Sequence, residues 1–262
     1  MRRRALVVGG LGAAAALAVG SSFVDPRPSP AQIVNEGWRL VWNEEFQHDL
    51  SPRVWVRARG APDSPYRAPF NPDLDASSFD PTYTEVRDGR LRIRWDATPS
   101  EVDGERYPYT TGIATTAAGF SFQHGLCEFR VWVPSEPGIS PAVWMLPVPI
   151  DTWPPEIDIA EWTWAGGGLQ AHLNVHWAPG PRGQIADFPA YASRVGNSWH
   201  TYCLQWEPDL VRVFFDGQLA YEYTGPGIPQ QPMYPVLSGG VLRGETPRPG
   251  AMLVDYIRVW QR

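Results

Sequence analysis

The chain has 262 residues, of which 43% are hydrophobic and 19% charged, and its formal net charge is −6. This composition supports a buried core and excludes a disordered polymer, and the negative charge argues against a protein that binds the phosphate backbone of nucleic acids. The 28 prolines and 25 glycines leave little room for long helices, and the 13% of aromatic residues favour strands joined by many turns.

The N-terminus has the pattern of an export signal. Three arginines at residues 2–4 precede an apolar run over residues 5–19 that ends in small residues. This run is shorter than the ~20 residues that cross a membrane, and an uncleaved membrane anchor is the alternative. We expect a protein that is secreted or held in the cell envelope, with a signal peptide over residues 1–20, a linker over 21–36 and one folded domain over 37–262.

Short β-strands are predicted along most of the folded domain. Residues 52–82 are rich in Pro, Asp, Ser and Arg and predict a long surface loop. After this loop, Leu91, Ile93 and Trp95 alternate with arginines, as in a strand with one face in the core. Further strand-like runs cover residues 38–42, 119–134, 141–146, 156–164, 169–177, 200–206, 210–215, 218–223, 233–242 and 252–260. No stretch has the period of an amphipathic helix, so we predict an all-β, antiparallel sandwich or barrel.

The two cysteines, Cys127 and Cys203, each lie in the middle of a strand-like run. A disulfide between them requires neighbouring strands with facing Cβ atoms. We interpret them as buried free thiols, with a disulfide as the alternative. With no second pair of cysteines, the sequence excludes a disulfide scaffold and a metal site built on cysteine.

The chemistry lies in three carboxylates within six residues. Side chains alternate between the faces of a strand, so Glu156 and Asp158 share one face and the intervening isoleucines take the other. Strict alternation sends Glu161 into the core, where an unpaired carboxylate is costly. One bulged residue near Ala160 returns Glu161 to the acidic face. We therefore predict a bulged strand with three acids on one side.

Clustered carboxylates suit acid–base chemistry on sugars. Like charges at close range raise the pKa of at least one group, which gives one proton donor and one ionised carboxylate, the pair required for glycoside hydrolysis. Trp144, Trp153 and Trp164 accompany the motif, and aromatic faces stack on the apolar faces of sugar rings. Trp162 points away from the acidic face by alternation and is interpreted as a core residue. The alternative for the motif is a solvated acidic face on an edge strand.

These residues resemble those of glycoside hydrolase family 16, and most of all its bacterial endo-β-1,3-glucanases (laminarinases). The signature of that family, Glu-x-Asp-x-x-Glu, is matched in full by residues 156–161. The resemblance covers roughly residues 38–261, with matching blocks at 40–46, 109–112, 120–125, 141–147, 199–202 and 252–260.

The resemblance implies a β-jelly-roll sandwich with a sugar-binding cleft on its concave sheet. By position, Glu156 is the nucleophile and Glu161 the general acid/base, and Asp158 controls the orientation and protonation of the nucleophile. Trp153 is expected to form the floor of the subsite beside the scissile bond and Trp144 to line the cleft. His176 is expected to reach the cleft from the neighbouring strand, with a structural role as its alternative.

The family resemblance also implies a structural calcium on the convex side, and no cofactor for catalysis. The matching acids are Glu45 and Asp255. Carboxylate oxygens suit calcium, and a cation shared by the two ends of the domain would stabilise the sandwich. The alternative is that both acids occupy ordinary surface positions.

Activity follows from the resemblance more directly than substrate. Tyr83 and Ile113 stand where laminarinases often have Asn and Arg. We expect a monomeric, endo-acting, retaining hydrolase of a β-linked polysaccharide, first a β-1,3-glucan and second another β-glycan such as a galactan. A carbohydrate-binding protein without catalysis on the same fold is the alternative from another class. Transglycosylation uses the same covalent intermediate and stays open.

Overall fold

The computed structural model describes residues 34, 37–177, 184–187 and 195–262. The predicted signal peptide lies outside the described residues, as does the predicted linker except for Val34. Within the described part of the chain, no helix is both long and apolar enough to cross a membrane.

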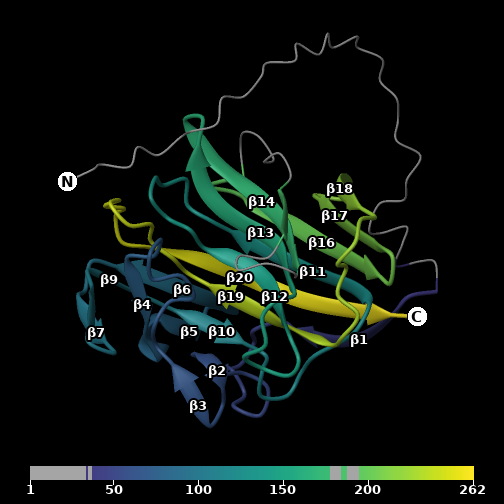
Figure 1. Cartoon of the computed structure of the whole chain (residues 1–262), viewed down its shortest axis with the longest axis horizontal. Helices are drawn as coiled ribbons and strands as arrows, with labels where there is room; N and C mark the ends of the chain where they lie inside the picture. The colour runs from purple at the N-terminus through teal and green to yellow at the C-terminus, as the bar shows by residue number, and fades with distance from the viewer. Residues whose placement is uncertain (1–33, 35–36, 178–183, 188–194) are drawn as a thin grey trace.

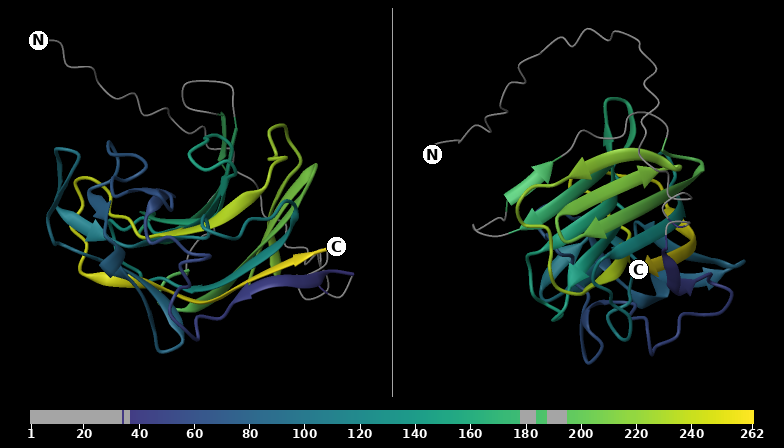
Figure 2. Two further views of the ribbon diagram at one scale, coloured as in Figure 1. Left: turned by 90° about the horizontal axis from the view of Figure 1, so that it is seen from below. Right: turned by 90° about the vertical axis from the view of Figure 1, so that its right-hand side faces the viewer.

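The domain is built from two sheets that lie on one another as curved layers (Figures 1 and 2). The larger sheet contains, in spatial order, β18 (Gln218–Tyr223), β17 (Leu210–Phe215), β16 (Trp199–Glu207), β11 (Gly125–Trp132), β20 (Gly250–Gln261), β6 (Arg90–Asp96), β9 (Tyr109–Thr111) and β4 (Ser77–Phe79). Two further strands extend it, with β1 (Arg39–Glu44) paired to β20 and β5 (Thr84–Arg87) paired to β6. All its pairs are antiparallel except β4 with β9.

The smaller sheet carries the functional cleft. Its order is β10 (Ile113–Thr115), β19 (Met233–Ser238), β12 (Ala142–Pro147), β13 (Glu156–Ala165), β14 (Gly168–Trp177) and β15 (Gln184–Asp187). Outside the two sheets lie the hairpins β2 (Arg59–Ala61) with β3 (Ser64–Tyr66) and β7 (Ser100–Val102) with β8 (Glu105–Tyr107), and the 3-10 turn η1 (Pro81–Tyr83). The predicted all-β, antiparallel sandwich is confirmed.

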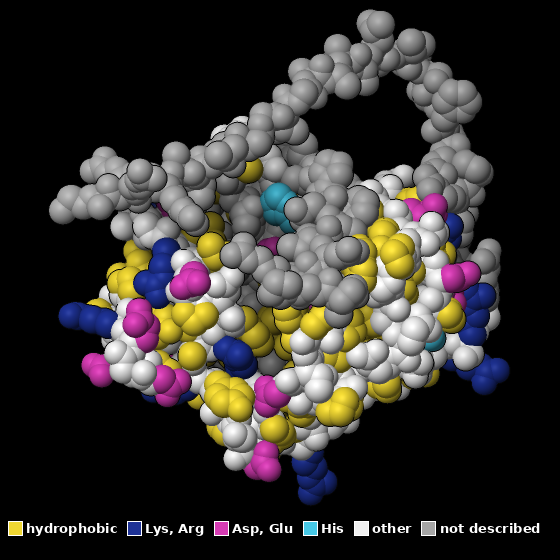
Figure 3. Space-filling model, viewed as in Figure 1, with side chains coloured by type: hydrophobic (Ala, Val, Ile, Leu, Met, Phe, Trp, Pro, Cys, Tyr) yellow, Lys and Arg dark blue, Asp and Glu magenta, His cyan; other side chains and the backbone are white. Residues whose placement is uncertain are grey.

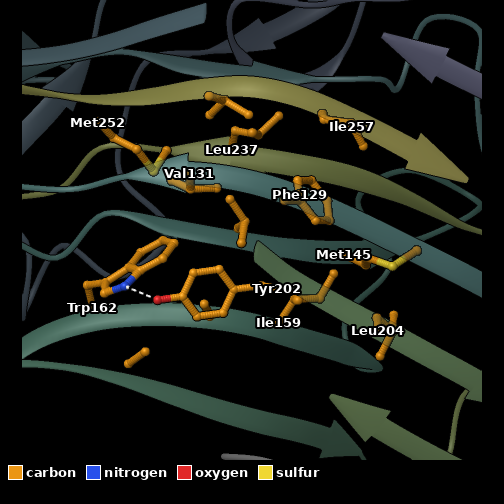
Figure 4. Close-up of a cluster of buried hydrophobic side chains, with 14 of the residues drawn as sticks. Phe129, Val131, Met145, Ile159, Trp162, Tyr202, Leu204, Leu237, Met252 and Ile257 are labelled. Carbon is orange, nitrogen blue, oxygen red and sulfur yellow. Dashed lines mark hydrogen bonds between the residues drawn. The ribbon is translucent and has the colours of Figure 1, made fainter. Parts of the chain in front are cut away.

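The core fills the space between the two sheets (Figure 4). Alternation predicts its members well: Leu91, Ile93 and Trp95 of β6 are buried, and the arginines between them are only half-buried. From the smaller sheet, Ile159 and Trp162 of β13 point into the same core, as Figure 4 shows. The strand β13 therefore has one face in the core and the other free for the carboxylates.

The prediction of a long surface loop over residues 52–82 is wrong in part. This segment contains β2, β3 and β4, and the residues of β4 (Ser77–Phe79) are all buried. Two serines and the polar residues around them hide a strand from a reading based on hydrophobic alternation. The strand forms because it pairs in parallel with β9, a partner more than 30 positions away in sequence.

The two cysteines are free thiols, as preferred from the sequence. They lie on the neighbouring strands β11 and β16, where Cys127 is opposite Leu204 and Cys203 is opposite Glu128. Because side chains alternate along a strand, this one-residue offset places the two thiols on opposite faces of the sheet. Their Cβ atoms point apart, and a disulfide cannot form.

Candidate active site

The three carboxylates lie on one bulged strand in the middle of the smaller sheet. Between β13 and β14, Asp158 is opposite Asn174 and Glu161 is opposite His172, so two residues of β13 stand against one of β14. The inserted pair is Ile159 and Ala160, both fully buried. The predicted bulge is confirmed, and it turns Glu161 to the same face as Asp158.

This acidic face opens into a cleft of about 730 Å³. All three carboxylates line the cleft, together with side chains of β12, β14, β19 and the segment 59–79. In the space-filling view, a hollow near the centre shows a histidine with acidic surface beside it (Figure 3). A cavity of this size, with an apolar lining and a few convergent polar groups, has the form of a ligand site.

Glu156 has two polar side chains next to it at the start of β13. Its Oε2 atom accepts a hydrogen bond from the indole N–H of Trp153 at 2.7 Å, and its Oε1 atom lies 3.6 Å from Nε2 of His176. Desolvation, followed by the charge and hydrogen bond of Asp158, raises the pKa of Glu156 well above its usual value, and the Trp153 N–H partly opposes this rise. The resting cleft thus favours a proton on this part of the cluster.

Asp158 and His176 form the second contact of the cluster. Asp158 is 7% exposed, and its Oδ2 atom lies 2.9 Å from Nε2 of His176. His176 is directly opposite Glu156 on β14, so one imidazole faces both carboxylates. The arrangement can hold one proton among three groups and fix the orientation of Glu156.

Two polar residues of β14 were not identified from the sequence. His172 is opposite Glu161, and its Nε2 atom lies 2.7 Å from the hydroxyl oxygen of Thr163. Asn174 is opposite Asp158, is 6% exposed, and its side-chain oxygen has no hydrogen-bond partner among the described residues. The signal was present as His172, Asn174 and His176 at every second position of a strand, which places all three on one face.

The two tryptophans expected in the cleft have different environments. Trp153 is 50% exposed and offers its ring to the cleft. Trp144 is 6% exposed, donates from its indole N–H to the Ser238 hydroxyl at 3.1 Å, and is covered by the ring of Phe70. Both line the cleft, but Trp153 presents far more apolar surface to a ligand.

The acids expected to bind calcium are each paired with arginine. Glu45 accepts two hydrogen bonds from Arg258, at 2.8 and 3.0 Å, and these lower the pKa of its carboxyl. Asp255 accepts a hydrogen bond from Arg130. Among the described residues, the one group of three or more side chains that could hold a metal ion lies in the cleft and includes neither acid. The residues at this place therefore do not fit the calcium site that the resemblance implies.

Chelation tests this prediction. Because arginines satisfy both carboxylates, we expect a chelator to leave the melting temperature unchanged in thermal denaturation. The measurement starts with an analysis of the metal content of the purified protein. If the purified protein holds calcium and chelation lowers its melting temperature, the cation binds and stabilises the domain, and the predicted site would be supported.

Paired glutamates in the cleft of a β-sandwich fit the two carboxylates that glycoside hydrolysis requires. Comparison with protein-family models identifies the family as "Glycosyl hydrolases family 16", matched over residues 78–258. The chain belongs to this family, and its sandwich is a jelly roll.

Individual relatives agree with this assignment. The chain is 28% identical to "Glucan endo-1,3-beta-glucosidase A1" of Niallia circulans over 89% of its own length and 39% of that protein. It is 30% identical to "Endo-1,3-1,4-beta-glycanase ExsH" of Rhizobium meliloti, over 87% and 49% of the two chains. The chain thus spans less than half the length of these relatives.

Among solved structures, the catalytic domain of an endo-1,3-beta-glucanase (laminarinase) from Thermotoga petrophila is similar, with a TM-score of 0.70 and 25% identity. That similarity covers 86% of this chain and 98% of that domain.

Proposed function

We propose that this chain is an endo-acting, retaining glycoside hydrolase that cleaves a β-linked glucan, with β-1,3-glucan as its first substrate. The observation that carries the proposal is the bulged strand β13, which presents Glu156, Asp158 and Glu161 to one cleft. A carbohydrate-binding protein without catalysis has no need for two glutamates on either side of an aspartate. Family membership supports the same reaction class.

In this proposal the two glutamates share a double displacement. The ionised carboxylate of Glu156 attacks the anomeric carbon, the glycosidic C–O bond breaks, and the leaving oxygen takes the proton of Glu161. Glu161 then accepts a proton from water, the resulting hydroxide adds to the anomeric carbon, and Glu156 leaves as a carboxylate. Two inversions give net retention of the β configuration.

In this scheme Asp158 can accept the proton that Glu156 must lose before it attacks. Glu156 must be ionised to attack, yet its pKa is raised by desolvation and by Asp158. The proton that Glu156 gives up has an acceptor nearby, because a carboxylate oxygen of Asp158 lies within 4.8 Å of one of Glu156. The indole N–H of Trp153 then stabilises the ionised Glu156.

The pH profile of Asp158→Asn tests this role. Removing the charge of Asp158 removes a cause that raises the pKa of Glu156, so Glu156 ionises at lower pH. We expect the acidic limb of the kcat/KM profile to move to lower pH, together with a lower kcat. Asp151→Asn is the matched control, because Asp151 is an exposed carboxylate of the same cleft. An acidic limb that stays in place in Asp158→Asn would contradict the assignment.

A panel of glycans tests the substrate. The chain is incubated with β-1,3-glucan, mixed-linkage β-1,3-1,4-glucan, cellulose and a β-galactan, and product sizes and reducing ends are measured. We expect oligosaccharides from β-1,3-glucan in the first minutes, as endo cleavage requires. Products larger than the substrate would indicate transglycosylation. Cleavage of galactan alone would change the proposed substrate from a glucan to a galactan. Binding without products would indicate a lectin.

We also propose that the protein is exported, on the evidence of its N-terminal sequence. Expressed in a bacterial host, the mature protein is expected in the medium or cell envelope with a new N-terminus near Ser21. N-terminal sequencing of the purified protein measures this. Recovery of the intact chain from the membrane fraction would favour an anchor instead.

A further inference from the structure

The cleft has an apolar wall on the side away from His176, which the proposed reaction does not use. Among the described residues, eight large hydrophobic side chains are exposed, and four of these line the cleft: Tyr66, Phe70, Leu74 and Trp153. Trp153 lies toward β14, with its ring 6.3 Å from that of His176. The other three belong to the segment 59–75. Exposed apolar area is unfavourable in water, so its concentration in one cleft marks a ligand surface.

Phe70 lies close to the catalytic strand. Its ring centroid is 4.8 Å from that of Trp144, edge to face, and Trp144 is directly opposite Asp158 on β12. Neighbouring strands are ~4.8 Å apart, so Phe70 stands over the strand next to the acids. Trp153 and Phe70 thus lie on opposite sides of the catalytic group, where a glycan chain that crosses the cleft would meet both rings.

The wall is held in place before any ligand binds. Arg59 donates a hydrogen bond to the carbonyl of Pro69 at 2.6 Å, and its guanidinium lies 4.4 Å from the centroid of the Phe70 ring. Arg243 donates to the carbonyl of Pro72 at 2.6 Å. A surface fixed by such contacts loses little conformational entropy when a ligand binds.

A carboxylate belongs to the same wall of the cleft. Asp75 lines the cleft and is half-buried, and no side chain among the described residues donates a hydrogen bond to it. Burial raises the pKa of Asp75 to about 6, against the backbone of Asn71 and the charge of Arg243, which lower it. A sugar hydroxyl could donate a further hydrogen bond to this carboxylate.

We infer that Phe70 and Asp75 form a sugar-binding subsite on the β12 side of the catalytic acids. The Phe70 ring lies under the apolar face of a pyranose, and the Asp75 carboxylate accepts a hydrogen bond from one of its hydroxyls. The occupant is a neutral glucose unit of the β-glucan proposed as the substrate. This subsite deepens the proposed function and rests on it.

The test separates the aromatic face from simple packing. Phe70→Leu keeps an apolar contact with Trp144 but removes the ring, and Phe70→Tyr keeps the ring. With β-1,3-glucan oligosaccharides of graded length, kcat/KM should rise when a sugar first fills this subsite. For oligosaccharides long enough to fill the subsite, we expect kcat/KM of Phe70→Leu to be about tenfold lower than that of the native protein, and Phe70→Tyr to keep the native value. Asp75→Asn replaces a charged acceptor by a weaker, neutral one, so it should raise KM for the same long oligosaccharides.

Folding and catalysis are controlled separately. A carboxyl whose pKa is raised on folding destabilises the protein when it is ionised, so Asp75→Asn should melt no lower than the native protein at pH 7. Leu40→Ala is the surface control, because Leu40 is exposed on β1 in the other sheet. Calorimetric titration of Glu161→Gln with the same oligosaccharides, with and without the Phe70 and Asp75 changes, measures affinity without turnover.

Two outcomes would overturn the subsite. One is that the native protein cleaves long oligosaccharides, and kcat/KM rises with oligosaccharide length just as strongly in Phe70→Leu and Asp75→Asn as in the native protein. The other is binding by Glu161→Gln that neither additional change weakens. A native protein that binds β-glucan through Phe70 but cleaves no glycan would overturn the proposed function and leave the subsite supported. Absence of binding to every glycan would overturn both.

Discussion

Replacing Glu156 by Gln should lower turnover of β-glucan by roughly four orders of magnitude or more, because the amide cannot form the glycosyl–enzyme intermediate. Glu161→Gln should cause a comparable loss with substrates whose leaving group needs a proton. Gln has nearly the same shape as Glu, so the indole N–H of Trp153 still finds an oxygen acceptor at residue 156. Circular dichroism and initial rates on β-1,3-glucan measure fold and turnover together.

Stability should change in the opposite direction from activity in Glu156→Gln. The folded-state pKa of Glu156 lies above its usual value, so this side chain favours folding below the pKa of the unfolded chain and opposes it as the pH rises. At pH 7 the uncharged Gln removes that opposition, and we expect a higher melting temperature for Glu156→Gln. Asp151→Asn, which removes an exposed carboxylate of the same cleft, should not raise the melting temperature in this way.

The two glutamates are distinguished by azide. In Glu161→Ala, an activated substrate still glycosylates Glu156, and azide then attacks the anomeric carbon without a general base, so turnover returns as a β-glycosyl azide. In Glu156→Ala, azide attacks the substrate directly and gives the α product. Inverted products from the native protein, or near-native turnover in Glu156→Gln, would contradict the double displacement.

Local alternation was sufficient to predict the catalytic strand. The order of polar and apolar residues over 156–161 places two acids on one face, and the cost of burying Glu161 predicts the bulge, which the pairing of β13 with both neighbours shows. The strands β17 and β18 were predicted at their observed bounds, and Asp216 and Gly217 between them take the positive φ angles of a tight hairpin turn. In each case the decisive information lies within a few residues.

What could not be predicted depends on residues far apart in sequence. The wall of the cleft at 59–75 was interpreted as part of a surface loop from its composition. Its position depends on contacts with distant residues, such as Phe70 with Trp144 and Pro72 with Arg243, which the sequence does not show. Glu45 lies more than 200 positions from its partner Arg258. Only the folded structure shows that Glu45 forms an ion pair with this arginine, where the sequence suggested a metal ligand. A single sequence carries no spacing rule for such contacts.

The core behind the catalytic strand should be sensitive to the loss of Trp162. This side chain is fully buried, donates from its indole N–H to the Tyr202 hydroxyl at 3.3 Å, and meets the Tyr202 ring edge to face at 5.3 Å (Figure 4). Removing a buried Trp leaves a large cavity, so Trp162→Ala should lower the free energy of unfolding by about 3–5 kcal/mol. Urea denaturation at pH 7 measures the loss.

The same change should reach the active site through the backbone. Trp162 follows Glu161, and its backbone N–H donates to the carbonyl of Pro141 at 2.9 Å, next to the bulge that orients the acid. We expect a folded fraction of Trp162→Ala to have lower kcat, because a displacement of Glu161 weakens proton transfer to the leaving oxygen. Trp162→Phe, which keeps an aromatic ring against Tyr202 but loses the N–H, should be affected less in both measurements. Loss of less than ~1 kcal/mol in Trp162→Ala, with full activity, would show that the two sheets do not depend on this contact to hold Glu161.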